Sequence, residues 1–169
     1  MAEHKENLLD WLRDAHAMEQ QAEQMLKAQA SRIQHYPELK ARLEAHLEET
    51  LQQQKIVEDC ITRLGGKPST AKDLAGKAMA FAQGVGGMAV SDEVIKGAIA
   101  GYVFENIEIA TYTVLIAAAK SIGDTATQRA CETILPQEQA MARWLLEHLP
   151  DVTTQYLARD AAEGLVAKR

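Results

Sequence analysis

Four long segments of this sequence carry apolar residues at alternating steps of three and four, and glutamate interrupts each of these stripes near its middle. Such spacing is typical of a helix that buries one face, and no segment shows the two-residue alternation of a strand. The pattern therefore predicts an all-α protein whose helices share one core and carry acidic side chains at the same level inside it.

Helix start and stop signals give approximate bounds. Proline at position 37 suits a first helical turn, the pairs 65–66 and 123–124 suit helix ends, and the pair 150–151 is expected to break the chain. We expect long helices at residues 5–34, 37–64, 91–122 and 125–149, a short helix at 70–83 and a short C-terminal helix after residue 150.

The lengths of the connections predict the topology. Short turns make the first two long helices antiparallel neighbours, and likewise the last two, whereas residues 67–90 form a long crossover. Two antiparallel hairpins joined by one long crossover make a four-helix bundle of the ferritin-like arrangement. A chain of 169 residues is long enough for one such domain, and we assign residues 1–169 to it.

Composition excludes some functions. The net charge of −6 without a basic stripe argues against binding to nucleic acid. The N-terminus has no apolar signal-peptide core, and the two cysteines lie in helical patterns, so we expect a cytoplasmic protein with reduced thiols. Residues 97–119 are long enough to cross a bilayer, but their two charged residues, Glu105 and Glu108, would be costly in lipid. A buried helix is the favoured interpretation, with no membrane partner.

The glutamates on the stripes are the candidate site. One such residue is usually a rotated register or a paired surface charge, but four helices with the same interruption at the same level point to a ligand. Buried unpaired carboxylates each cost several kcal/mol, and no Lys or Arg occupies the matching stripe positions. Protonation and pairing with distant cations remain as alternatives to metal. The candidate ligands are Glu19, His46, Glu49, Glu105, Glu108 and Glu138, and on the second helix the stripe passes through Glu49 or Thr50.

The spacing of these residues suggests two metals. Glu19 and Glu49 are 30 residues apart, as are Glu108 and Glu138, so two similar hairpins would bring four carboxylates to one point. We expect Glu19 and Glu108 as terminal ligands and Glu49 and Glu138 as bridges. His46 and Glu105, each three residues before a glutamate, share the helix face of that glutamate and would complete the ligand shells.

The donor set favours particular metals. Five glutamates carry five negative charges, which two divalent ions would nearly cancel. Oxygen-rich ligation with one imidazole suits iron or manganese better than zinc or copper, and we favour iron. Gln53 also faces the stripe as a candidate partner of a ligand. Tyr112 lies one turn after Glu108, where a core role with a satisfied hydroxyl is favoured over contact with a ligand.

Three segments resemble a known group of proteins. Residues 14–21 (DAHAMEQQ), 46–50 (HLEET) and 105–110 (ENIEIA) resemble the YciE/YciF stress-protein branch of the ferritin-like superfamily, with the closest likeness to YciE, over nearly the whole chain. The resemblance implies a ferritin-like bundle, a dinuclear metal site and expression linked to stress. Most di-iron sites of this superfamily use Glu-x-x-His on the second and fourth helices, whereas Gln52 and Met141 stand three residues after Glu49 and Glu138 here.

Two functional hypotheses follow. The first is a dinuclear metal protein that acts on dioxygen, peroxide or ferrous iron in stress protection, as a di-iron oxidase or peroxidase would. The second is a non-enzymatic stress or scaffold protein with a structural or vestigial metal site. The resemblance and the largely apolar third helix also predict a homodimer.

Overall fold

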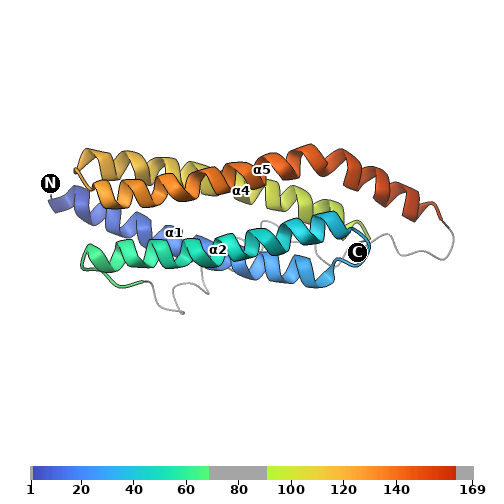
Figure 1. Ribbon diagram of the computed structural model, residues 1–169, viewed down its shortest axis with the longest axis horizontal. Coiled ribbons are helices and arrows are strands. Elements are labelled where there is room, and N and C mark those ends of the chain that lie inside the picture. The colour runs from blue at the N-terminus through green and yellow to red at the C-terminus, as the bar shows by residue number, and fades with distance from the viewer. Residues whose placement is uncertain (1, 69–90, 163–169) are drawn as a thin grey trace.

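The structure is a computed structural model that describes residues 2–68 and 91–162, and these residues form four helices and no strand (Figure 1). The helices are α1 (Ala2–Arg32), α2 (Pro37–Arg63), α4 (Glu93–Ser121) and α5 (Thr125–Asp160). The expected all-α bundle is confirmed, and the first three long helices end within a few residues of their expected bounds. The helix predicted at residues 70–83 lies outside the described residues.

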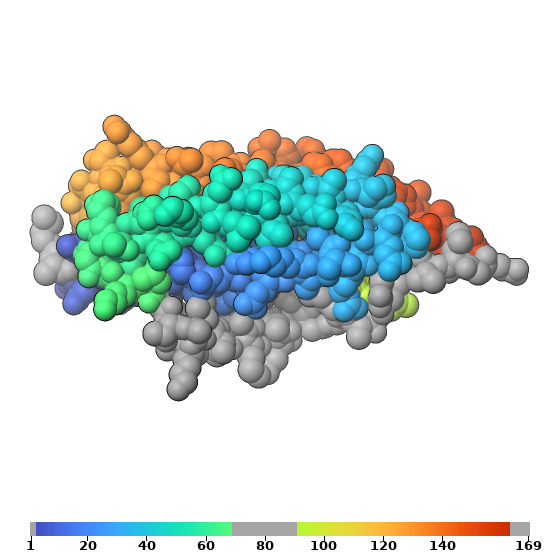
Figure 2. All heavy atoms as spheres, turned by 60° about the horizontal axis from the view of Figure 1, so that its bottom comes forward, coloured from blue at the N-terminus to red at the C-terminus, as the bar shows by residue number. Residues whose placement is uncertain are grey.

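The helices are arranged as two hairpins. α1 packs along α2, and Figure 2 shows these two helices side by side over the length of the bundle. α4 packs along α5 in the same way, and the hairpins meet through α1 against α4 and α2 against α5. The turn after α4 needs Gly123, whose φ of 74° lies in the left-handed region that favours glycine.

Two ion pairs join the hairpins at opposite ends of the bundle. At one end, Arg32 at the end of α1 donates to Glu93 at the start of α4, with an Nη2–Oε2 distance of 3.0 Å. At the other end, Arg63 at the end of α2 donates to Asp124 before α5, with an Nη2–Oδ1 distance of 2.7 Å. Asp124 also accepts from the backbone N–H of Thr127 and so caps α5. Each contact between the hairpins is therefore antiparallel.

Two separate apolar clusters form the core. One is built around buried residues near the start of α1 and the other around buried residues near its end. The first includes Leu8, Leu12, Val57, Ile61, Leu115 and Ile134, and the second includes Leu26, Leu39, Leu43, Met141, Leu145 and Val152. Buried polar side chains separate the two clusters, which confirms that the stripes are apolar except near their middle.

The expected break at Pro150 is wrong. α5 continues through Pro136 and Pro150 to Asp160, so residues 151–160 extend this helix instead of forming a separate one. A proline removes one backbone hydrogen bond, but burial of Val152 on the second apolar cluster stabilises the helix beyond it. The hydroxyls of Thr153 and Thr154 also donate to the carbonyls of Leu149 and Pro150.

α4 is the most apolar helix of the described chain. By length and composition alone it would suffice to cross a membrane, and 39% of its most apolar window is buried inside the protein. Glu105 and Glu108 lie in the middle of this helix and are almost fully buried in the bundle. The interior of the bundle therefore places these two carboxylates beside the other buried polar side chains instead of in lipid.

We predict that two adjacent leucines of α5 differ strongly in their effect on stability. Leu145 is 2% exposed and Leu146 is 51% exposed. Leu145→Ala should lower the free energy of unfolding by about 2–5 kcal/mol, whereas Leu146→Ala should change it by less than about 1 kcal/mol. Urea denaturation of both variants measures the difference. Equal losses would mean that the register of α5 after Pro136 is wrong.

Candidate metal centre

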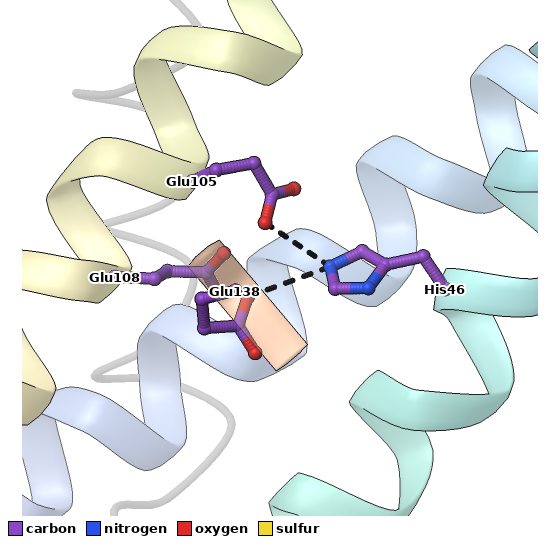
Figure 3. A group of neighbouring side chains, drawn as sticks. All are labelled: His46, Glu105, Glu108 and Glu138. Atoms are coloured by element: carbon purple, nitrogen blue, oxygen red, sulfur yellow. Dashed lines mark ion pairs between the residues drawn. The ribbon is translucent and has the colours of Figure 1, made fainter. Parts of the chain in front are cut away.

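Four ligand-type side chains meet between the two apolar clusters. His46 comes from α2, Glu105 and Glu108 from α4, and Glu138 from α5, and they point toward one another (Figure 3). One ligand atom of each lies within 4.8 Å of the others. All four residues are at most 1% exposed. Three of the four helices thus deliver donors to one small buried volume.

Helical periodicity explains why these side chains converge. Glu105 and Glu108 are one turn apart, so both face the interior from α4. Glu138 follows the buried Ile134 by four residues and precedes the buried Met141 by three, which puts its carboxylate on the core face of α5. His46 follows the buried Leu43 at the same spacing on α2.

His46 supplies the one nitrogen ligand among these four residues. Its Nε2 lies 3.2 Å from Glu105 Oε2 and 3.4 Å from Glu138 Oε2, while its Nδ1 lies 2.7 Å from Glu49 Oε2. Burial alone would lower the pKa of His46, but the nearby carboxylates of Glu105 and Glu138 and the hydrogen bond with Glu49 raise it to about 11. When the imidazole is neutral, an Nδ1–H donated to Glu49 would leave Nε2 as the lone pair that faces the carboxylates.

Burial in the bundle raises the pKa values of three of these glutamates, Glu19, Glu105 and Glu108. Burial, together with the nearby Glu138, raises the pKa of Glu19 well above its usual value. Burial and Glu19 do the same for Glu108. Burial raises the pKa of Glu105 to about 7, although the contact with His46 opposes this shift. Each shift shows that the folded chain favours a proton, or another cation, at these oxygens.

Two neutral side chains donate hydrogen bonds to the buried carboxylates. The hydroxyl of Tyr112 donates to Glu19 Oε1, and the side-chain amide of Gln53 donates to Glu138 Oε1. Gln53 Nε2 also lies 2.8 Å from Gln137 Oε1. Tyr112, Gln53 and Glu19 are all completely buried. These contacts stabilise one oxygen of each carboxylate without adding positive charge.

Several buried polar atoms have no hydrogen-bond partner among the described residues. Those in the buried layer are Glu19 Oε2, His46 Nε2, Thr50 Oγ1, Gln53 Oε1, Glu105 Oε2, Glu138 Oε2 and both carboxylate oxygens of Glu108. Orphaned buried acceptors are rare in folded proteins because each one is costly. Convergent carboxylates with one imidazole are a donor set that fits an iron or manganese ion.

The structure places the six predicted ligands in three groups. His46, Glu105, Glu108 and Glu138 form the convergent set. Glu19 lies next to it, as its electrostatic effect on Glu108 shows. The side chain of Glu49 is one-third exposed and contacts His46 Nδ1 and Arg42. A bridging role for Glu49 therefore requires its side chain to turn inward, and it stays a prediction.

Thr50 and Gln53 are the residues of α2 that line the buried layer beside His46. The sequence left Glu49 and Thr50 as alternatives for the stripe, and the structure buries Thr50. Steps of seven from the buried His46 and Leu43 lead to Gln53 and Thr50, and this count is the signal that separates them from Glu49. The hydroxyl of Tyr112 donates to Glu19, a candidate ligand, so the satisfied core hydroxyl and the contact with a ligand, which were alternatives from the sequence, occur together.

A protein-family model described as "Domain of unknown function (DUF892)" matches residues 3–158. The chain belongs to the DUF892 family. A solved structure from Xanthomonas campestris pv. campestris is 44% identical to this member, with a TM-score of 0.82, and the match covers 95% of this chain and 99% of that one.

Two more distant structures share the bundle. The Escherichia coli stress protein YciF is 20% identical with a TM-score of 0.75, and the match covers 92% of this chain and 99% of YciF. A bacterioferritin from Desulfovibrio desulfuricans, described with a diiron site, is 23% identical with a TM-score of 0.73, and the match covers 97% of each chain. At this identity the likeness shows the fold alone. The expected ferritin-like bundle and the resemblance to the YciE/YciF branch are confirmed.

We predict that the metal-free DUF892 protein loses stability as the pH rises. Glu19, Glu105, Glu108 and His46 all have folded pKa values above their unfolded ones. Their contribution to stability is therefore full below their unfolded pKa values, 4.5 for glutamate and 6.5 for histidine, and is lost as the pH rises through the folded values, about 7 for Glu105 and about 11 for His46.

The melting temperature of the metal-free protein should fall between pH 6 and pH 9 by at least about 4 °C, which corresponds to roughly 1–2 kcal/mol. Glu108→Gln should reduce this fall because it removes one carboxyl that resists ionisation. Glu132→Gln, an exposed change on α5, serves as the control. A melting temperature that stays flat or rises over this range would contradict the electrostatic description of the site.

Proposed function

We propose that this DUF892 protein is a dinuclear metal protein that acts on dioxygen, peroxide or ferrous iron and protects cells under stress. One observation carries the proposal: a buried group of carboxylates and one imidazole whose ligand atoms converge without hydrogen-bond partners among the described residues. The bacterioferritin with the same bundle has a diiron site, and YciF is a stress protein, which supports the two parts of the proposal.

The donor set supports two ions, with iron favoured over manganese. His46, Glu105, Glu108 and Glu138 supply one imidazole and three carboxylates, and Glu19 adds a fourth carboxylate beside them. Hard oxygen donors with a single nitrogen suit these two metals. Two divalent ions would also cancel the four buried negative charges, for which His46 is the cationic partner among the described residues.

The residues of this chain would hold and shield the ions. Glu49 orients His46 through Nδ1, and the carboxylates of α4 and α5 close the opposite side. The two apolar clusters cover the site along the bundle axis and exclude water from it. Bound iron or manganese would supply one-electron redox chemistry toward a small oxidant, and the chain would supply fixed ligands for both oxidation states.

The competing hypothesis is a non-enzymatic stress or scaffold protein. Hydrogen bonds from Tyr112 and Gln53, and the contacts of His46, already satisfy part of the buried layer without a metal. Reactivity separates the two hypotheses. Reduced, iron-loaded protein should consume O₂ or H₂O₂ over several turnovers if the proposed function is right. A loaded but inert protein would favour a structural role.

We predict that Glu138→Gln abolishes binding of the metal pair and leaves the metal-free bundle equally or more stable. Glu138 belongs to the convergent set and lies close to His46, and removal of its charge also relieves repulsion with Glu19. Glu105→Gln should weaken binding less, because Glu108 remains beside it on the same face of α4. Metal analysis of protein from iron- and manganese-supplied cells, and melting of the metal-free forms, measure both effects.

The wild type should hold close to two metals per chain, and the exposed change Glu132→Gln should leave that number unchanged. If Glu138→Gln keeps two metals or clearly destabilises the metal-free form, the assignment of Glu138 is wrong. Wild-type protein that holds no iron or manganese, and whose melting temperature does not respond to Fe²⁺ or Mn²⁺, would contradict the metal site itself.

We further propose that the protein acts in the cytoplasm as a homodimer that pairs through α1 and α4. The outer face of α4 exposes large apolar side chains: Ile99, Val103, Ile107 and Val114 are 43–50% exposed, and Trp11 of α1 is 43% exposed beside them. A groove of about 650 Å³ runs between Trp11, Val103 and Val114. Contiguous apolar patches of this kind mark association sites more often than free surface.

Light scattering should therefore give about twice the chain mass of 18.6 kDa. Val103→Asp should shift the protein toward the monomer, whereas Leu51→Asp, at a similarly exposed leucine on α2, should not. A wild-type protein that scatters as a monomer would defeat the dimer, and a Leu51→Asp variant that dissociates would place the interface elsewhere.

A further inference from the structure

The buried polar layer is not symmetric along the bundle axis. His46 and Glu105 lie on the side of the second apolar cluster, and each is seven residues, two helical turns, before Gln53 or Tyr112 on the same helix. On the first side the oxygens face an imidazole that can bind a metal through Nε2. On the other side, Gln53 and Tyr112 are hydrogen-bond donors to Glu138 and Glu19, and they present an amide N–H and a hydroxyl O–H to the oxygens.

The ligand pattern of α2 explains this asymmetry. Ferritin-like dinuclear sites place a Glu-x-x-His pair on two of their helices. On α2 the buried pair of polar side chains with that spacing is Thr50 and Gln53, so a hydroxyl and an amide stand where a carboxylate and an imidazole would complete a second metal. On α5 the partner of Glu138 at this spacing is the thioether of Met141, which is a poor ligand for iron or manganese.

The neutral donors and a second ion would compete for the same oxygens. Gln53 Nε2 contacts Glu138 Oε1, and the Tyr112 hydroxyl contacts Glu19 Oε1. A second cation beside these two oxygens would meet the amide N–H of Gln53, which is neutral and cannot act as a ligand. It could bind only after the donors leave, for example by rotation of the Gln53 amide, which exchanges its donor for its acceptor.

We propose that the two metal positions are unequal: the first ion binds among His46, Glu105, Glu108 and Glu138, and Gln53 and Tyr112 hold the place of the second by donating to Glu138 and Glu19. This inference rests on the proposed metal function and adds an order of loading to it. Gln53 is then a specificity-determining residue for metal number. The second ion must break these two hydrogen bonds in order to bind, and hydrogen bonds to charged groups are strong. The affinity for the second ion should therefore be about tenfold or more below the affinity for the first.

Calorimetric titration of the metal-free full chain with Mn²⁺ tests the order of loading, and native mass spectrometry counts the ions at each step. The wild type should bind the first Mn²⁺ at least about tenfold tighter than the second. Gln53→Glu replaces the donor by a carboxylate and should bring the two affinities within a few fold. Gln52→Glu makes the same change at the adjacent exposed position and should leave the wild-type difference intact.

Tyr112→Phe provides a second variant that removes a single oxygen atom. It should tighten the second Mn²⁺ severalfold without changing the first, and it decides the question if Gln53→Glu does not fold. Two equal Mn²⁺ sites in the wild type would overturn the inference and leave the proposed function standing. No binding of Mn²⁺ or of anaerobic Fe²⁺ to the wild type would overturn the proposed function. An unchanged second affinity in the folded Gln53 or Tyr112 variant would also overturn the inference.

Discussion

The structure depends on the burial of four glutamates beside a single histidine in an otherwise apolar bundle. Glu19, Glu105, Glu108 and Glu138 are almost completely hidden, and His46 is the one cationic partner within the described part of this layer. Charges removed from water are expensive unless paired, so this layer opposes folding unless protons or metal ions neutralise it. The need to neutralise this buried charge therefore links the stability of the protein to pH and to metal binding.

The rest of the bundle holds this layer rigid. An apolar cluster lies on each side of it, and ion pairs at both ends join the two hairpins, so the helices cannot slide past one another without loss of packing. The same rigidity makes small differences in the layer consequential. An imidazole on one side and an amide with a hydroxyl on the other give two positions of different chemistry in a bundle whose hairpins look alike.

Much of this arrangement is visible in the sequence, because helical periodicity fixes which residues share a face. The stripe on α4 placed Glu105 and Glu108 in the core, and the matched spacing of 30 residues pointed to Glu138. A rotation of one residue separates Glu49 from Thr50 on α2. Alternating steps of three and four leave both positions open, and Thr50 is selected only by the step of seven from Leu43, whose burial the structure shows. Pro150 looked like a helix end, yet tertiary burial of Val152 outweighs the local preference of proline.

The most direct test of the account is anomalous diffraction from crystals of the iron-loaded protein, recorded at the iron absorption edge. The account predicts a peak within coordination distance of His46 Nε2 and of the carboxylates of Glu105, Glu108 and Glu138. Iron peaks only at surface carboxylates, or none with the buried glutamates hydrogen-bonded to one another, would contradict it.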